Sequence, residues 1–286
     1  MTLPRVSPPN VFPLAAGAPK PPMGAPGADA HRQTGFVLGA EVELVLRGLS
    51  LEGACAEATS GAKFRKQRTA AVLGPWSRSW LCRLEALHAI QWGNYAAAIP
   101  LVRTAADYQA ALLALLGGDG PQWEAWLEQG GIALAPDVHA TEFRLHAFRS
   151  GEVLAAHPVL GPLYRTATDL SLPHFGSTLL IAGNESAPDH VTITFGDRDF
   201  HTGLAQLVLG WLLELSSVMA ETLPAHPAVF GVADGDALSA YQAEAARVGG
   251  ERDRCRIEAI ERDGERRYLV HNWRRTPGAA AKRILL

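Results

Sequence analysis

The stretch Tyr95-Ala-Ala-Ala-Ile-Pro-Leu-Val-Arg-Thr-Ala-Ala-Asp-Tyr-Gln-Ala-Ala-Leu-Leu-Ala-Leu-Leu116 decides the fold class. It is apolar over about six helical turns. Arg103 and Asp107 stand one turn apart on a stripe that is otherwise alanine, so another helix can come close and cover them. A buried ion pair is costly unless it is fully hydrogen-bonded, and we favour a structural pair that fixes helix register over a functional site. Replacing Arg103 by alanine would then cost about 3 kcal/mol of folding stability.

Outward from this stretch, the pattern predicts a bundle of helices. Residues 77–92 are apolar on nearly all sides, which is typical of a helix in a protein interior. Residues 200–222 are expected to form another long apolar helix. Its most apolar part, residues 204–220, is too short to span a membrane and carries the polar side chains of Gln206 and Glu214, so we expect a buried helix. Shorter helices are expected at these positions: residues 37–46, 122–129, 138–149 and 237–248. The predicted fold class is mainly α, a helical bundle.

Two segments have β character instead. Residues 178–182 and 190–195 are rich in β-branched and apolar side chains and are joined through Gly183-Asn184, so they resemble two short strands. Residues 256–273 predict a second hairpin that turns at Asp263-Gly264, a dipeptide suited to a type I′ turn. The bundle is therefore expected to carry one or two small β-hairpins.

The domain organisation follows from composition. Residues 1–34 are rich in proline, glycine and alanine and have few large apolar side chains, so we expect a disordered tail. Residues 35–250 form the predicted bundle domain, in which Gly48 and Gly53 separate short helical pieces. Residues 251–286 are expected to form a basic hairpin with a C-terminal tail.

The composition favours a cytoplasmic protein. The net charge of −3 gives no global attraction to nucleic acid or to a membrane. Cys55, Cys82 and Cys255 are widely spaced and odd in number, which indicates reduced thiols rather than a disulfide framework or a Cys-x-x-Cys site. We find no basic segment that leads into an apolar core near the N-terminus, and so expect no signal peptide.

The sequence predicts no cofactor and no metal. It contains no glycine-rich phosphate loop, nucleophile elbow or His-Glu-x-x-His run. The Glu-x-x-His unit of di-iron bundles occurs once, at Glu85 and His88, whereas such bundles use it twice. His139, Glu142 and His146 share one helix face within reach of a divalent metal, but a solvated polar face is the favoured interpretation because Arg149 lies beside them.

The spacing of Arg83 and His88, Arg-Leu-Glu-Ala-Leu-His, resembles the motif of HEPN-type helical ribonucleases. The resemblance implies that the arginine stabilises phosphate charge and that the histidine serves in acid–base cleavage of RNA without a metal. A wider pattern, Asn94 to Tyr108 followed by Leu170-Ser-Leu-Pro-His174, is similar to bacterial helical proteins loosely related to that group, with an aspartate at position 107 where a glutamate is expected. It implies that Arg103, Asp107 and His174 contribute to such a site. It covers about residues 75–220.

The C-terminal hairpin offers a third hypothesis. Its arginines, with Tyr268 and Trp273, could follow phosphates and stack on bases. The alternative is an edge on which Glu258, Glu261 and Glu265 pair with neighbouring arginines across the strands, and the interleaved charges favour it.

Three functions therefore remain open. The favoured one is a non-catalytic helical interaction or scaffold protein whose partner is another protein or a second copy, dimeric through residues 204–220. The alternatives are a HEPN-like metal-independent ribonuclease or toxin-type protein, and nucleic-acid binding through the hairpin, with RNA as the partner. No membrane partner is expected.

Overall fold

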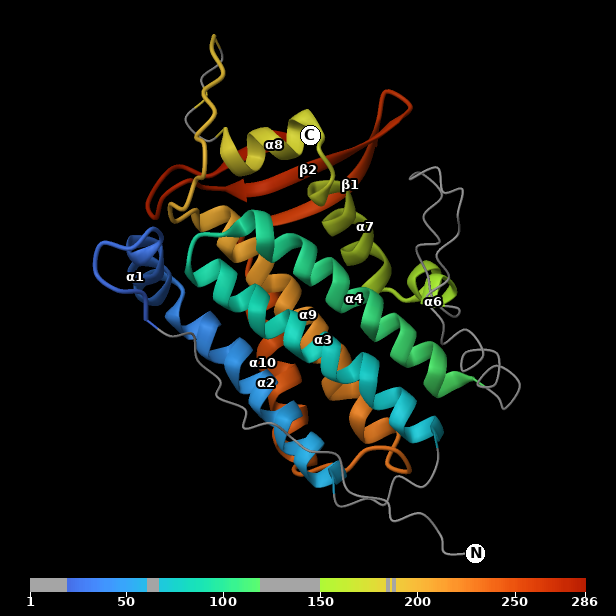
Figure 1. Ribbon diagram of the computed structural model, residues 1–286. Coiled ribbons are helices and arrows are strands. Elements are labelled where there is room, and N and C mark those ends of the chain that lie inside the picture. The colour runs from blue at the N-terminus through green and yellow to red at the C-terminus, as the bar shows by residue number, and fades with distance from the viewer. Residues whose placement is uncertain (1–19, 61–66, 119–149, 184–185, 187–188) are drawn as a thin grey trace, which may run out of the picture.

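The computed structural model describes residues 20–60, 67–118, 150–183, 186 and 189–286. The expected mainly α fold is confirmed (Figure 1). The described helices are α1 (Ala28–Val37), α2 (Gly39–Ser60), α3 (Gln67–Gln91), α4 (Tyr95–Gly117), α6 (Ser150–Ala156), α7 (Leu160–Ser171), α8 (Phe175–Ala182), α9 (Thr202–Ala225) and α10 (Gly235–Gly249). The described strands are β1 (Arg256–Arg262), β2 (Glu265–Trp273) and β3 (Lys282–Leu285).

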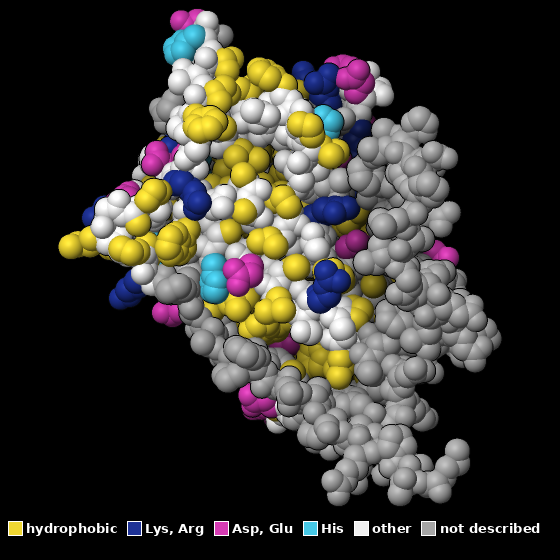
Figure 2. Space-filling view, viewed as in Figure 1, with side chains coloured by type: hydrophobic (Ala, Val, Ile, Leu, Met, Phe, Trp, Pro, Cys, Tyr) yellow, Lys and Arg dark blue, Asp and Glu magenta, His cyan; other side chains and the backbone are white. Residues whose placement is uncertain are grey.

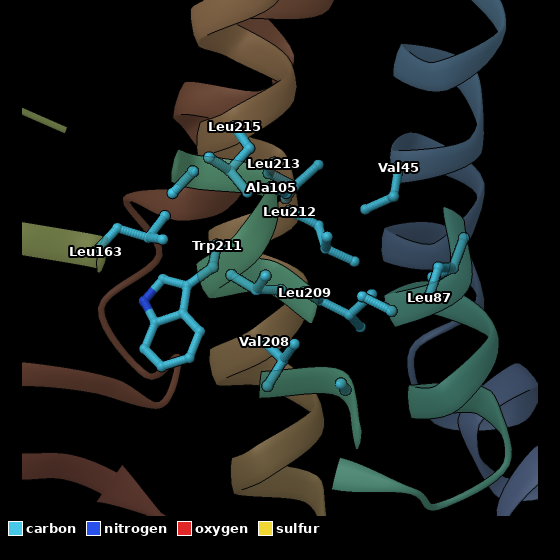
Figure 3. Packing of buried hydrophobic residues seen from close by; sticks show 14 of the residues in the cluster. Val45, Leu87, Ala105, Leu163, Val208, Leu209, Trp211, Leu212, Leu213 and Leu215 are labelled. Carbon is cyan, nitrogen blue, oxygen red and sulfur yellow. The ribbon is translucent and has the colours of Figure 1, made fainter. Parts of the chain in front are cut away.

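Helix α9 lies at the centre of the bundle. It packs against α2, α3, α4 and α10. Leu209 and Leu212 of α9 are fully buried, and Val45 of α2, Leu87 of α3 and Leu163 of α7 lie around this helix (Figure 3). The apolar side chains of α9 are therefore buried in the core of a single chain. A dimer through residues 204–220 would require that core to open.

The three strands form a small antiparallel sheet in the order β1-β2-β3 at one end of the bundle (Figure 1). The predicted hairpin of residues 256–273 is confirmed, because β1 and β2 pair from Arg256 with His271 to Arg262 with Glu265. Asp263 and Gly264, with φ of 56° and 78°, supply the two left-handed residues that a type I′ turn requires. The chain then returns as β3 along the other side of β2.

The predicted pair of strands at residues 178–182 and 190–195 is wrong. Residues 178–182 belong to helix α8. The hydroxyl groups of Ser177 and Thr178 both donate to the carbonyl of His174, which supports the first turn. A short apolar run does not distinguish strand from helix by periodicity, and here the helix prevails. Residues 191–194 belong to no described helix or strand, and Phe195 lies in a turn, so the second half of the prediction is wrong as well.

Helical structure also begins earlier than expected. Residues 28–34, assigned to the disordered tail, belong to α1. Gly48 and Gly53 do not break α2. A Cβ at Gly48 would lie 2.6 Å from the ring of Tyr241, so this glycine lets α10 approach closely instead of ending a helix. The predicted helices at residues 122–129 and 138–149 lie outside the described residues.

An ion pair is buried between α2 and α3. The Nη2 atom of Arg83 donates to Oε1 of Glu52 at 2.6 Å, and the two side chains are 0% and 3% exposed. Arg83 also donates to Ser216 of α9 at 3.1 Å, and the indole N–H of Trp76 donates to the same Glu52 oxygen at 2.6 Å. This pair joins three helices through charged hydrogen bonds in the dry core.

The structure corrects the interpretation of Arg103 and Asp107. Both residues are half-buried, and no ion pair between the two is found within the described contacts. Arg103 instead donates to the hydroxyl of Tyr164 at 2.7 Å and to Thr168 at 3.4 Å, both on α7. Arg103 thus joins α4 to α7 through neutral partners. The expected loss of about 3 kcal/mol, which assumed a buried acid left unpaired, no longer applies to this residue.

We therefore expect Glu52→Ala to lower the free energy of unfolding by about 3–5 kcal/mol, because it leaves the Arg83 charge buried without its partner. Arg103→Ala should cost only about 1–2 kcal/mol, the size of hydrogen bonds lost at a half-exposed site. Urea unfolding followed by circular dichroism measures both. Equal losses in the two variants would contradict this assignment of the core ion pair.

A histidine ring caps helix α7. The Nδ1 atom of His157 accepts the backbone N–H groups of Val159 and Leu160, both at 3.2 Å. Only a ring with an unprotonated Nδ1 can accept these bonds. Burial lowers the pKa of His157 and, with a further contribution from Arg275, that of His201, which lies 3.0 Å from Asp197. The two backbone hydrogen bonds therefore require the His157 ring to be neutral in the folded protein.

Histidine protonation should weaken the fold in mild acid. The unfolded chain binds protons at an ordinary histidine pKa of about 6.5, above the folded value, so stability present above that pH is lost as the pH falls. Desolvation raises the pKa of Glu214 to about 7, and its titration in the same range has the opposite sign. We therefore compare variants: His157→Asn keeps an acceptor that does not titrate, and should lose less stability than wild type between pH 7.5 and 5.0 in urea unfolding. Identical losses would exclude the cap as the cause.

Candidate functional site

Arg83 and His88, the pair of the ribonuclease resemblance, face different surroundings. Arg83 is sealed in the core against Glu52 and Ser216. His88 borders a shallow groove of about 340 Å³ on the outside of α3 and lies 3.7 Å from the carboxylate of Glu85. Arg198 lines the same groove. The structure does not bring Arg83 and His88 to one site.

Arg103, Asp107 and His174 are also separate in their contacts. Arg103 is held by Tyr164 and Thr168, and a ring contact at 5.0 Å adds to the bond with Tyr164. His174 is exposed and precedes α8, where its carbonyl accepts two hydroxyl groups. No described contact of Arg103 involves His174. A shared phosphate would need both side chains within a few ångströms of it.

The described residues contain no group of three histidine, cysteine or acidic side chains placed to hold a metal ion. His139, Glu142 and His146, the metal alternative considered from the sequence, lie outside the described residues. All three cysteines are free thiols, with Cys55 and Cys255 buried.

The aromatic side chains of the C-terminal hairpin serve the fold. The hydroxyl of Tyr268 donates to Asp169 of α7 at 2.5 Å. Trp273 is buried, and its ring lies so close to α9 that a Cβ at Gly203 would meet it at 2.7 Å. Glu261 pairs with Arg266 in register across the strands. These contacts occupy the two rings that base stacking would need and interleave the charges.

Exposed apolar side chains gather around α8 at the sheet end of the molecule. Leu172, Phe175 and Leu285 are 44%, 66% and 39% exposed. The segment of residues 189–195, which we call the arm, adds Val191, Ile193 and Phe195 at 56%, 50% and 102%. Figure 2 shows hydrophobic side chains along the arm and over α8 at the top of the view. We refer to these six residues together as the α8 face. Large apolar side chains exposed side by side are typical of interaction surfaces.

A pocket of about 510 Å³ lies within this face, between α8 and the end of the sheet. Phe175, Leu179 and Leu180 line it from α8, and Ile284 and Leu285 line it from the sheet side. The base of the arm, at Gly183 and Ser186, closes one side of the pocket. The apolar face thus contains a hollow that can receive side chains.

The charged residues around this pocket are positive. Arg274, Arg275 and Lys282 line it, and no aspartate or glutamate does so among the described residues. Arg275 also bonds the carbonyl of Phe200 at 2.7 Å and the carboxylate of Asp199 at 3.2 Å. Lys282 is exposed at the start of β3. The pocket therefore favours an apolar ligand that carries an acidic group.

Sequence reasoning did not find the Glu52 partner of Arg83 or the α8 face. Glu52 belongs to α2, and nothing in the spacing of residues along the chain pairs it with Arg83. The arm did leave a signal, because its apolar residues alternate with threonines as in a strand that faces a partner. No family model, curated protein or solved structure matches this chain.

Two described helices, Tyr95–Gly117 and Thr202–Ala225, are long and apolar enough to cross a membrane by length and composition alone. Their most apolar windows are 44% and 78% buried inside the protein. For the second helix, this burial agrees with the core position predicted from the sequence.

The separation of the candidate residues predicts the outcome of a ribonuclease assay. We expect no metal-independent cleavage of structured or single-stranded RNA above the level of a mock preparation, with or without EDTA. Cleavage by wild type that is lost in His88→Ala or in His174→Ala would contradict this expectation and would locate the catalytic histidine. A capillary electrophoresis assay with end-labelled RNA measures it.

Proposed function

We propose that this chain is a non-catalytic helical interaction protein whose α8 face binds another protein chain. The carrying observation is the group of exposed apolar side chains around α8, above all Phe175, beside a pocket with positive lining. Burial of such side chains is the main favourable term in protein association. The proposal places the protein in the cytoplasm, where its three thiols would stay reduced.

The alternative functions have less support in the geometry. A HEPN-like ribonuclease needs an arginine and a histidine at one phosphate, whereas Arg83 is sealed in the core. Nucleic-acid binding through the hairpin needs free aromatic rings and a continuous basic face. Tyr268 and Trp273 are instead held by α7 and α9, and acidic side chains alternate with the arginines.

The α8 face differs from other exposed apolar residues because a pocket lies beside it. Phe36 of α1 is 91% exposed, but the pockets described here do not include it. Phe175 is 66% exposed and lines the pocket. Single exposed apolar residues are normal on protein surfaces, so Phe36 serves as a matched control for Phe175.

Site-specific photo-crosslinking tests the proposal. With benzoylphenylalanine at position 175 in cells, we expect one discrete crosslinked product. Leu172→Asp should lower the yield of this product by about 10-fold, the loss of affinity expected for one buried leucine. The same crosslinker at position 36 should give no such species. The mass identifies the partner as a second copy or as another protein.

An equal yield of adducts at positions 175 and 36 would contradict the proposal. So would an adduct at position 175 whose yield does not change with Leu172→Asp, because the apolar surface would then contribute nothing to the contact.

A further inference from the structure

The arm has the sequence pattern of a strand but belongs to no described sheet. Residues 189–195 read Asp-His-Val-Thr-Ile-Thr-Phe, and the β-branched and aromatic residues alternate as strand residues do. Val191, Ile193 and Phe195 are each at least half exposed. In Figure 1 the arm projects from the end of α8, beyond the helices. Three apolar side chains at alternate positions are thus presented together to solvent.

Two N–H groups of the arm are bonded to described residues of the same chain. The N–H of Thr194 donates to the carbonyl of Ala182 at 2.8 Å, and the N–H of Thr192 donates to the hydroxyl of Ser186 at 3.0 Å. The N–H groups of Val191 and Ile193 have no hydrogen-bond partner among the described residues, so they are available to another chain.

Strand β3 offers a matching edge. It is the outer strand of the described sheet, next to β2. Leu286 and Tyr268 exchange two backbone hydrogen bonds, of 2.8 and 3.2 Å. In an antiparallel pair the residues between such bonded positions direct their N–H and C=O groups outward. Arg283 and Leu285 therefore present their backbone groups at the open edge, and Leu285 also borders the pocket.

The groove beside this edge complements the arm in polarity. Phe175 and Leu179 of α8 and Ile284 of β3 provide apolar walls, and Lys282 lies at the start of the strand. The arm brings three apolar side chains and the carboxylate of Asp189 at one end. An edge strand beside a helix is also the site at which extended peptides add to a sheet, with main-chain bonds for affinity and pockets for alternate side chains.

The positions of the arm and of the groove point to a second copy of this chain as the occupant of the groove. Gly183 and Ser186, at the base of the arm, line the same pocket that would receive an arm. The arm and the groove are thus neighbours on one face, and a two-fold axis through that face satisfies both contacts at once. An arm and a groove on opposite faces of the molecule would instead build an open filament.

We propose that two copies exchange arms, so that the arm of each adds to the open edge of β3 in the other and places Val191, Ile193 and Phe195 over the groove between α8 and β3. This inference rests on the proposed function and names its partner. It also replaces the hypothesis of a dimer through residues 204–220, because the apolar side chains of that segment are buried in the core.

Sedimentation equilibrium of the full chain tests the exchange. Wild type should form a dimer, and Ile193→Asp should raise its dissociation constant by about 100-fold, because a symmetric dimer buries that side chain twice. Leu285→Pro removes an outward N–H from the edge and should have a similar effect. Phe36→Asp, the same kind of change away from the face, should leave the constant unchanged.

Mixing the two variants distinguishes arm exchange from other dimers. Ile193→Asp retains an intact groove and Leu285→Pro retains an intact arm, so a heterodimer keeps one intact arm–groove contact whereas a dimer of either variant keeps none. The mixture should therefore form a heterodimer at concentrations at which each variant alone is monomeric. If Leu285→Pro loses the native circular dichroism spectrum, Arg283→Pro replaces it as the variant of the same edge. The effect of Ile193→Asp on the dissociation constant tests the arm independently of both proline variants.

A wild-type protein that stays monomeric would overturn the exchange, and so would a dimer that neither the arm nor the edge variant weakens. Neither result would affect the crosslinking at position 175 to a different protein. The failure of this inference is therefore distinguishable from failure of the proposed function.

Discussion

The ion pair of Arg83 and Glu52 is the constraint on which the rest of the bundle depends. Its side chains are almost completely buried, and Arg83 reaches α9 through Ser216. Moving two charges out of water is so costly that the surrounding helices must supply hydrogen bonds in fixed positions. Trp76 and Ser216 supply them. The relative positions of α2, α3 and α9 follow from this requirement.

Once α9 is fixed at the centre, the sheet end of the molecule is also fixed. The backbone N–H groups of Thr202 and Gly203, at the start of α9, donate to the carbonyls of Arg275 and Arg274, which follow β2. Tyr268 of β2 bonds Asp169 of α7. The sheet is therefore anchored to α9 and α7, and this anchoring places β3 beside the pocket that α8 lines.

Much of the fold could be predicted from the sequence. The long apolar helices, the central position of residues 204–220 and the Asp263-Gly264 hairpin all follow from local patterns of hydrophobicity and turn chemistry. Residues 178–182 were predicted as a strand because a five-residue apolar run has no distinctive period. Gly48 was expected to separate two helical pieces. This expectation failed because the role of Gly48 depends on its contact with Tyr241, a residue far away in the chain.

Less of the candidate site could be predicted. Arg83 was singled out by a spacing that suggests chemistry, but its role is set by Glu52, and no rule of spacing joins positions so far apart in the chain. The α8 face combines Leu172 after α7, Phe175 of α8, Leu285 of β3 and the arm, and these residues come together only when the chain is folded. The alternation of Val191, Ile193 and Phe195 was the one local signal, and it predicted a strand without indicating its partner.

The most direct measurement of the central claim is amide hydrogen exchange of wild type at a series of protein concentrations. Exchange of arms predicts that hydrogen exchange at the amides of Val191, Ile193, Arg283 and Leu285 becomes slower as concentration rises, while exchange at amides of α1, such as that of Phe36, does not change. Exchange rates at the arm and at β3 that are independent of concentration would contradict it.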